Sequence, residues 1–376
     1  MKIEAIDVFR VDLPYAGGVY RLSGGRSYTG FDATIVRLRT ACGVEGWGES
    51  TPFGSTYVAS HAAGVRAGIA EMAESLLGRD PRHHDRIYDV MDGALAGHAH
   101  AKTALDIACW DIAAKSAGLP LCDMLGGRVE GRVPVISSIG SDDPDAMREN
   151  VARHRARGFL GHSIKIGATE EEGGPRIDAE RIRACLSDAG SGEWFLADAN
   201  GGMSPEQVLR MMSLLPDGLD FVLEAPCATW RETLSLRARV QVPILLDELV
   251  QSEADLTLAV QQDACDGVGL KISKQGGITP TVRQRSIARA AGMVMSVQDT
   301  VGSDIAFAGI LAVAQSTPRT LLRCALDCRA MVALQTAAYD APIRDGGVEA
   351  PATPGLGVTP DLDTLGLPIA SYGALS

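Results

Sequence analysis

The sequence has no long apolar run and no dense run of basic residues, and these two absences exclude whole classes of protein. Its apolar stretches are well short of the roughly 18 to 20 residues that a membrane span requires. The 47 Asp and Glu outnumber the 35 Lys and Arg, and the resulting net charge of −12 disfavours nucleic acid as a partner. The first residues, MKIEAIDVFRVDLP, lack the apolar core of a signal peptide. We therefore expect a cytoplasmic protein that binds neither membranes nor nucleic acid.

The eight cysteines lack the paired spacing of a zinc site. Only Cys324 and Cys328 lie close together, and most others fall in apolar stretches where a small buried thiol is expected. Free thiols fit a reducing compartment. No G-x-G-x-x-G motif follows any predicted strand, which disfavours an open dinucleotide-binding sheet.

The first 128 residues combine strand patterns with helix patterns. EAIDVFRVDL and DATIVRLRT alternate as half-buried antiparallel strands do, and the Gly-rich segment between them carries three tyrosines, as expected of a mobile loop. AKTALDIACWDIAAKSAG has one apolar stripe at helical spacing and ends at Gly118 and Pro120. An α+β domain is predicted here.

From about residue 129 to residue 340, short apolar runs alternate with longer amphipathic segments, which is typical of repeated strand-helix units. The runs are VPVISSI (133–139), SIKIG (163–167), FLADAN (195–200), FVLEAP (221–226), PILLDE (243–248), GVGLKIS (267–273), MVMSVQD (293–299) and TLLRCAL (320–326). Eight such units predict a closed α/β barrel. The Pro/Gly-rich tail, 341–376, lies beyond the eighth strand and is expected to pack back on the first domain.

Most of the predicted strand ends carry a charge. Asp198, Glu224 and Asp247 follow strands three, four and five, so their carboxylates should converge at the carboxyl rim of the barrel, where such folds place their chemistry. Three carboxylates repel one another unless a cation lies between them. An oxygen-only set suits Mg²⁺, with Mn²⁺ second. The alternative is that one or more of them forms an ordinary ion pair.

Lys165 and Lys271 end strands two and six, which are opposite each other in a ring of eight. The two amines should face each other across the mouth, although lysines that extend to solvent are the alternative. Paired bases beside a metal suit removal of a proton alpha to a carboxylate, since Mg²⁺ stabilises the enediolate charge that develops.

These motifs in this order resemble the muconate-lactonizing subgroup of the enolase superfamily. The helix AKTALDIACWDIAAKSAGLPLCDMLGG and the tail PGLGVTPD resemble the same subgroup, so the resemblance covers nearly the whole chain. It implies a modified (β/α)7β TIM barrel under a capping domain that the tail completes, and a homo-oligomer. It also implies Mg²⁺ on Asp198, Glu224 and Asp247, with Lys165 and Lys271 as acid/base residues. The loops at 15–28 and after Glu49 would close over the substrate.

The chain departs from the subgroup at several positions. Ser163 replaces the first lysine of the usual Lys-x-Lys motif, which removes one positive charge beside Lys165 that would help to hold its amine neutral. All seven histidines lie at or before residue 162, so strand seven offers Gln298 and Asp299 instead of a His-Asp dyad. The Asp-x-Asp motif of dipeptide epimerases is reduced to Asp327.

VQDTVGSDIAFAG is similar to members that act on proline-like compounds. An amino-acid substrate would find partners for its nitrogen in Asp299 and Asp327, and in the ring faces of Tyr15 and Tyr20, unless these tyrosines only pack the loop. The further candidates for substrate contact are Ser163, Asn200, Glu248 and Gln298. Because members with Ser-x-Lys resemble cis-3-hydroxy-L-proline dehydratases, we expect dehydration. A proline betaine or hydroxyproline betaine epimerase, a dipeptide epimerase and a catalytically silent barrel are the alternatives.

Overall fold

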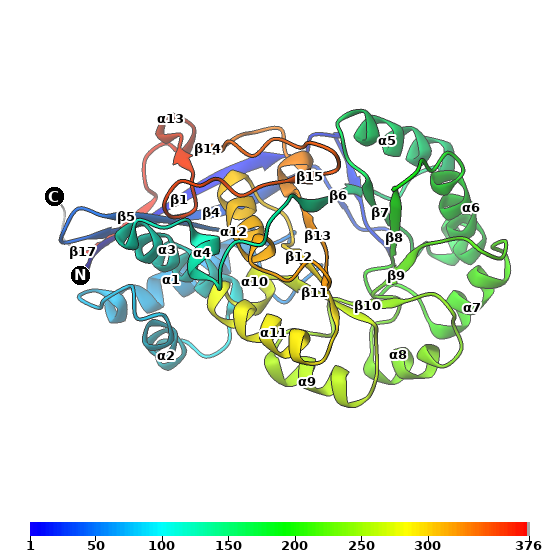
Figure 1. The fold of residues 1–376 in the computed structure, drawn as a ribbon, viewed down its shortest axis with the longest axis horizontal. Coiled ribbons are helices and arrows are strands. Elements are labelled where there is room, and N and C mark those ends of the chain that lie inside the picture. The colour runs from blue at the N-terminus through cyan, green and yellow to red at the C-terminus, as the bar shows by residue number, and fades with distance from the viewer. Residues whose placement is uncertain (374–376) are drawn as a thin grey trace.

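The computed structural model describes residues 1–373, which fold into two parts that pack against each other (Figure 1). The N-terminal elements and the end of the chain, drawn in blue, teal and red, form an α+β domain. The middle of the chain, drawn from green through orange, forms a barrel of strands with helices around it. The two ends of the chain therefore lie in the same part of the molecule.

The α+β domain is built on a four-stranded sheet. Its strands, in spatial order, are β17 (Ala370–Gly373), β1 (Ile3–Pro14), β4 (Gly30–Thr40) and β5 (Glu45–Ser50). β1 and β4 are antiparallel from Ala5 opposite Arg39 to Pro14 opposite Gly30, as the alternating sequences predict. β17 pairs with β1, so the end of the chain completes this sheet.

Three helices pack on the sheet, namely α1 (Ala62–Leu76), α2 (His84–Ala94) and α3 (Ala99–Ala117). The predicted helix corresponds to α3, and it ends at Gly118 in the left-handed conformation. α3 lies so close to β5 that a Cβ on Gly48 would be 2.9 Å from the Ala104 carbonyl carbon, which only glycine avoids. The prediction of a single apolar stripe is wrong, because α3 is buried on nearly all sides.

The barrel contains eight parallel strands across residues 133–326, all of which are described, and pairing of the last strand with the first closes it. The strands are β6 (Val133–Ile139), β7 (Gly161–Lys165), β8 (Trp194–Asp198), β9 (Val222–Glu224), β10 (Ile244–Leu246), β11 (Gly267–Lys271), β12 (Val294–Gln298) and β13 (Leu322–Leu326). Each coincides with one of the eight apolar runs, so the predicted barrel is confirmed.

One longer helix follows each of the first seven strands, which gives the (β/α)7β order. These helices are α5 (Pro144–Ala156), α6 (Gly174–Leu186), α7 (Pro205–Ser213), α8 (Trp230–Arg237), α9 (Glu253–Gln261), α11 (Ile278–Ala290) and α12 (Asp304–Gln315). Local sequence fixes several of their starts. Before α7, the Ser204 hydroxyl accepts from the Gln207 backbone while the Gln207 side chain accepts from Ser204, and Pro205 opens the first turn.

Shorter elements connect these parts. They are β2 (Tyr20–Arg21), β3 (Ser27–Tyr28), α4 (Leu121–Met124), η1 (Glu170–Glu172), α10 (Ile272–Gln275), η2 (Cys328–Met331), β14 (Ala337–Ala338), β15 (Gly347–Val348), β16 (Thr359–Pro360) and α13 (Leu362–Leu365). β2 and β3 form a hairpin within the Gly-rich loop, and they bring Tyr20 into the interior. β15 pairs with β6 before the chain reaches β17, so the tail also contacts the barrel.

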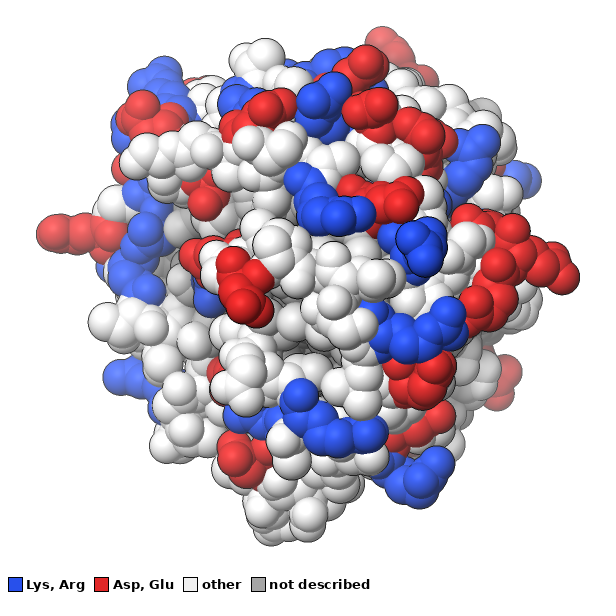
Figure 2. All heavy atoms as spheres, turned by 90° about the vertical axis from the view of Figure 1, so that its right-hand side faces the viewer, with Lys and Arg blue, Asp and Glu red and all other residues white. Residues whose placement is uncertain are grey.

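The outer face of the barrel shown in Figure 2 carries basic and acidic side chains interspersed, without a broad field of one sign. None of the helices formed by residues 1–373 is long and apolar enough to cross a membrane.

Candidate functional site

The carboxyl ends of the barrel strands bring the predicted acidic residues together. The parallel register sets Lys165 beside Asp198 and Asp198 beside Glu224, and Asp247 follows directly after β10, the next strand. All three carboxylates are buried, with exposures of 2%, 1% and 1% for Asp198, Glu224 and Asp247. Burying charges at such positions is costly unless they are paired, so their convergence on one arc marks a site.

The two predicted lysines line one cavity from opposite strands. Lys165 ends β7 and Lys271 ends β11, four strands away in the closed barrel. Neither amine extends into bulk solvent, since the residues are only 8% and 5% exposed. Lys165 forms an ion pair with Asp198, and Lys271 forms one with Asp247.

These ion pairs decide the protonation of the lysines. Burial lowers the pKa of Lys165, but Asp198, Tyr20 and Glu224 outweigh it and hold the pKa above its ordinary value. Burial likewise lowers the pKa of Lys271, and Asp247, Glu248 and Glu224 raise it further than burial lowers it. Both amines are therefore ammonium groups as long as no divalent cation neutralises the carboxylates.

The side-chain atoms that could bind a metal at this rim are of the type that a hard divalent cation prefers. All the ligand-type atoms are oxygens, and burial, followed by the charges of Asp198 and Asp247, raises the pKa of Glu224 well above its ordinary value. Two further buried oxygens, Asn200 Oδ1 and Glu248 Oε2, have no hydrogen-bond partner among residues 1–373. Within residues 1–373, no three His, Cys, Asp or Glu side chains are already grouped closely enough to hold a metal, and lysines pair with two of the three carboxylates.

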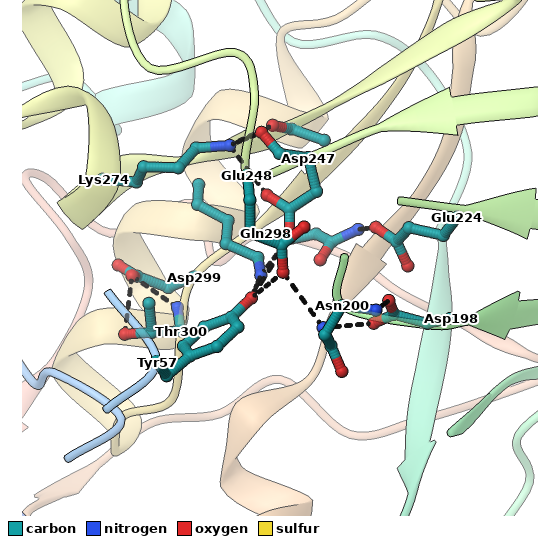
Figure 3. Close-up of polar contacts among 12 residues, drawn as sticks. Tyr57, Asp198, Asn200, Glu224, Asp247, Glu248, Lys274, Gln298, Asp299 and Thr300 are labelled. Atoms are coloured by element: carbon teal, nitrogen blue, oxygen red, sulfur yellow. Dashed lines mark hydrogen bonds and ion pairs between the residues drawn. The ribbon is translucent and has the colours of Figure 1, made fainter. Parts of the chain in front are cut away.

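Two residues at the site were not predicted from the sequence (Figure 3). Lys274 donates to Asp247 Oδ1 at 2.7 Å and to the Asp247 carbonyl at 2.6 Å. Tyr57 comes from the loop between β5 and α1, where its hydroxyl accepts from Lys271 Nζ at 2.5 Å and donates to Glu248 Oε1 at 2.8 Å. Lys274 follows Lys271 by three residues, which is about one helical turn, so this spacing could have indicated that the two lysines lie on the same side. No local pattern indicated Tyr57.

Most of the predicted substrate contacts lie at the cavity. Tyr20, Ser163, Asn200, Gln298 and Asp299 line it together with the lysines. Each of three has a fixed polar partner: the Tyr20 hydroxyl is 2.5 Å from Ser138 Oγ, Gln298 Nε2 donates to Glu224, and Asp299 accepts from Ser273.

The other three predicted contacts lie off the cavity. Glu248 lies behind the residues that line the cavity, where its carboxylate accepts hydrogen bonds from Tyr57 and Asn200. Tyr15 lines a neighbouring pocket and packs its ring on Tyr20, with ring centres 5.2 Å apart. The Asp327 carboxylate is bound by the Arg329 guanidinium through contacts of 2.9 and 2.7 Å. The structure therefore does not bring Tyr15 or Asp327 to the place where a substrate would meet the lysines.

Comparison with known families agrees with this architecture. The family model described as enolase C-terminal domain-like matches residues 146–364. The model of the mandelate racemase/muconate lactonizing enzyme N-terminal domain matches residues 27–126. The chain belongs to the enolase superfamily.

Similar enolase-superfamily proteins include a dehydratase and a racemase. The chain is 38% identical over 373 residues to a cis-3-hydroxy-L-proline dehydratase from Roseibium aggregatum, covering 99% of this chain and 100% of that protein. It is 28% identical over 309 residues to an N-succinyl-L-Arg/Lys racemase from Bacillus cereus, covering 81% and 82% of the two chains.

A similar solved structure comes from Roseovarius nubinhibens and is described as a mandelate racemase/muconate lactonizing enzyme complexed with magnesium. It is 66% identical, superposes with a TM-score of 0.98 and covers 99% of this chain and 100% of that one. Enolase-superfamily enzymes generally use Mg²⁺, and the oxygen donors described above are compatible with it.

Proposed function

We propose that this enolase-superfamily enzyme removes the proton alpha to the carboxylate of an amino acid, and that it dehydrates cis-3-hydroxy-L-proline. The observation that carries this proposal is the pair of buried lysines, Lys165 and Lys271, which line one cavity from opposite strands. The 38% identity to a dehydratase of that substrate supports the choice of substrate.

Asp198, Glu224 and Asp247 would hold Mg²⁺. When bound there, Mg²⁺ would supply stabilisation of the negative charge that develops on the substrate carboxylate. Neutralising the carboxylates also weakens the interactions that keep Lys165 and Lys271 protonated. Mn²⁺ would suit the same oxygens.

The two lysines divide the reaction between them. One amine takes the alpha proton, the electrons of that C–H bond form the double bond to the beta carbon, and the C–O bond to the hydroxyl breaks. The other lysine, as an ammonium group, protonates the departing hydroxyl so that it leaves as water. Buried positions for both amines exclude bulk water from this exchange.

Epimerisation of a proline or hydroxyproline betaine is the second candidate. It would use the same lysines, one to remove the alpha proton and the other to return a proton on the opposite face. The placement of one lysine on each side of the cavity and the racemase relative favour it. A dipeptide epimerase is less favoured because Arg329 already binds Asp327. A catalytically silent barrel is less favoured because burying the carboxylates and lysines costs free energy, and without catalysis these residues would have no function.

The test is incubation with Mg²⁺ in D2O, separately with cis-3-hydroxy-L-proline, L-proline betaine and 4-hydroxyproline betaine. An ultraviolet-absorbing ketimine or enamine product from the first compound supports dehydration. Deuterium at the alpha carbon with inverted configuration in a betaine supports the epimerase instead. No exchange and no product with any of the three would exclude the proposed activity on these substrates.

Lysine variants test the division of roles. Lys165→Ala and Lys271→Ala should each lower turnover by about a thousandfold, which is within the usual contribution of a general acid or base. Lys2→Ala, at an exposed position on the other domain, is the matched control and should keep full activity. Full activity in Lys271→Ala would remove that residue from the mechanism. Light scattering of the purified protein would test the further expectation of a homo-oligomer.

A further inference from the structure

A second pocket lies beside the active site, on the far side of Tyr15. The loop carrying Tyr15, the segment that follows β6 and the helix α5 enclose it. Its cavity volume is about 280 Å³, several times the ~30 Å³ that one water occupies in the liquid. Tyr15 separates it from the substrate cavity by packing on Tyr20. No step of the proposed reaction uses this pocket.

One face of α5 supplies the polar lining. Asn150, Arg153, His154 and Arg157 are spaced i, i+3, i+4 and i+7, so helical periodicity places them on a single stripe that faces the pocket. His154 is buried and contacts the ring of Phe159, whereas Arg153 and Arg157 are exposed and positively charged. The pocket therefore presents a basic wall.

The two arginines of this wall differ from their neighbours on the same helix. Arg148 pairs with Asp145 at 3.2 Å and Arg155 pairs with Glu193 at 2.6 Å. Within residues 1–373, Arg153 and Arg157 have no carboxylate at ion-pair distance. Among the described arginines of this segment, the guanidinium groups without a carboxylate partner, Arg153 on α5 and Arg157 directly after its last residue, are thus the ones that line the pocket.

His154 gives a second, independent indication of a ligand. It is only 9% exposed, it lines the pocket, and its buried Nδ1 has no hydrogen-bond partner in the part of the chain that the structure describes. Burial, together with Arg157, His162 and Arg153, lowers its pKa to about 4, so the ring is neutral at pH 7. An unsatisfied buried nitrogen costs free energy, which a polar group in the pocket would recover once the ring turns to bring Nδ1 to it.

We propose that this pocket binds a small oxyanion, either a carboxylate or a phosphate group. Guanidinium groups match both anions because their N–H donors form a planar fork. One carboxylate, Asp142, also lines the pocket, but it is engaged by Arg21 at 3.3 Å, which leaves Arg153 and Arg157 to set the charge. This site is independent of the proposed dehydration.

Calorimetric titration with sodium phosphate and with sodium succinate, at constant ionic strength and with and without MgCl2, tests the proposal. The wild-type protein should bind at least one of the two, and the anion that binds identifies the group. Arg153→Ala and Arg157→Ala should each weaken binding about tenfold, as expected for loss of one charge-assisted hydrogen bond. Arg148→Ala, on the same helix but away from the pocket, should bind as the wild type does.

The histidine provides a readout that does not depend on a variant. On titration of the wild-type protein with the anion that binds, the NMR signals of His154 should shift and saturate with the calorimetric Kd, while those of the distant, exposed His61 stay unchanged. Binding of neither anion by the wild type, equal binding by all three arginine variants, or an unresponsive His154 would overturn the proposal.

Discussion

At the scale of single residues, the site is defined by competition between ammonium groups and a cation for the same oxygens. Asp198, Glu224, Asp247 and Glu248 give four formal negative charges, and Lys165, Lys271 and Lys274 give three positive ones. Glu224 alone among the three predicted ligands has no lysine at ion-pair distance within residues 1–373. A divalent ion near Glu224 would therefore compete with Lys165 and Lys271 for the other two carboxylates.

Tyr57 is expected to position Lys271. Tyr57→Phe keeps the ring but removes the hydroxyl that joins Lys271 to Glu248, so kcat for cis-3-hydroxy-L-proline should fall about tenfold, the value of one hydrogen bond to a charged group. Tyr28→Phe is the control, because its hydroxyl bonds to Thr56 at 2.9 Å in an exposed position. Equal kcat values for the two variants would show that the Tyr57 hydroxyl has no such role.

Asp299 should make stability depend on pH. Burial raises its pKa from 3.8 to about 7. Between these values the folded state binds the proton that the unfolded state has released, so the free energy of unfolding falls as pH rises from about 4 to about 7 and then levels off. Asp299→Asn removes the titrating carboxyl group. Over that pH range, the free energy of unfolding of the variant should therefore fall by up to about 4 kcal/mol less than that of the wild type. Parallel curves from urea unfolding would contradict the assignment.

At the scale of elements, a side chain from one domain caps a helix of the other. Glu49 on β5 is fully buried and accepts from Ser303 N at 2.8 Å, Ser303 Oγ at 2.6 Å and Ala306 N at 3.0 Å, at the start of α12. The two N–H groups are backbone donors that the first turn of a helix cannot pair internally, and the third donor is the Ser303 hydroxyl. Glu49 thus fixes the sheet of the first domain against the helix that follows β12.

The strength of this cap can be measured. Glu49→Ala should lower the free energy of unfolding by about 3 kcal/mol, because buried N–H groups lose their acceptor. Glu45→Ala, on the same strand but with an exposed carboxylate 3.7 Å from Arg37, should cost less than about 0.5 kcal/mol. Denaturant unfolding at pH 7 separates the two expectations, and a loss of less than about 1 kcal/mol for Glu49→Ala would mean that water or a rearrangement replaces the cap.

The elements differ in how far the sequence predicts them. The barrel strands are short apolar runs between polar helices, so their order and ends could be predicted, and with them the common edge on which Asp198, Glu224 and Asp247 lie. Helix α3 and its end at Gly118 were also predicted, but its burial on nearly all sides was not, because several of its buried polar residues bond to distant partners. Asp106, for example, accepts from Thr279 N and Oγ1 at 2.9 and 2.7 Å.

At the scale of the whole molecule, the site is assembled from both domains. The barrel supplies the carboxylates and lysines, while the first domain supplies Tyr20 and Tyr57 through the loops at 15–28 and after Glu49. Contacts of this kind depend on how loops are placed in three dimensions, so no local pattern could single out Tyr57. The same reason explains why Tyr15, five residues before Tyr20 in the same loop, lies in a different pocket.

Metal binding should stabilise the whole fold. Mg²⁺ at about a hundred times its Kd would raise the free energy of unfolding by about 3 kcal/mol, so EDTA should lower the Tm and abolish activity, and MgCl2 or MnCl2 should restore both. Glu224→Gln should lose this response, whereas Glu232→Gln, in the first turn of α8, should keep it. A response that survives Glu224→Gln would place the ion elsewhere.

The central claim is that three carboxylates hold a divalent ion while two lysines flank the substrate. Its most direct test is a crystal structure of the protein with Mg²⁺ and cis-3-hydroxy-L-proline. We predict ion density in contact with Asp198, Glu224 and Asp247, and the alpha carbon between the amines of Lys165 and Lys271. Lysines still paired with Asp198 and Asp247, with the ion or the ligand bound elsewhere, would contradict the account.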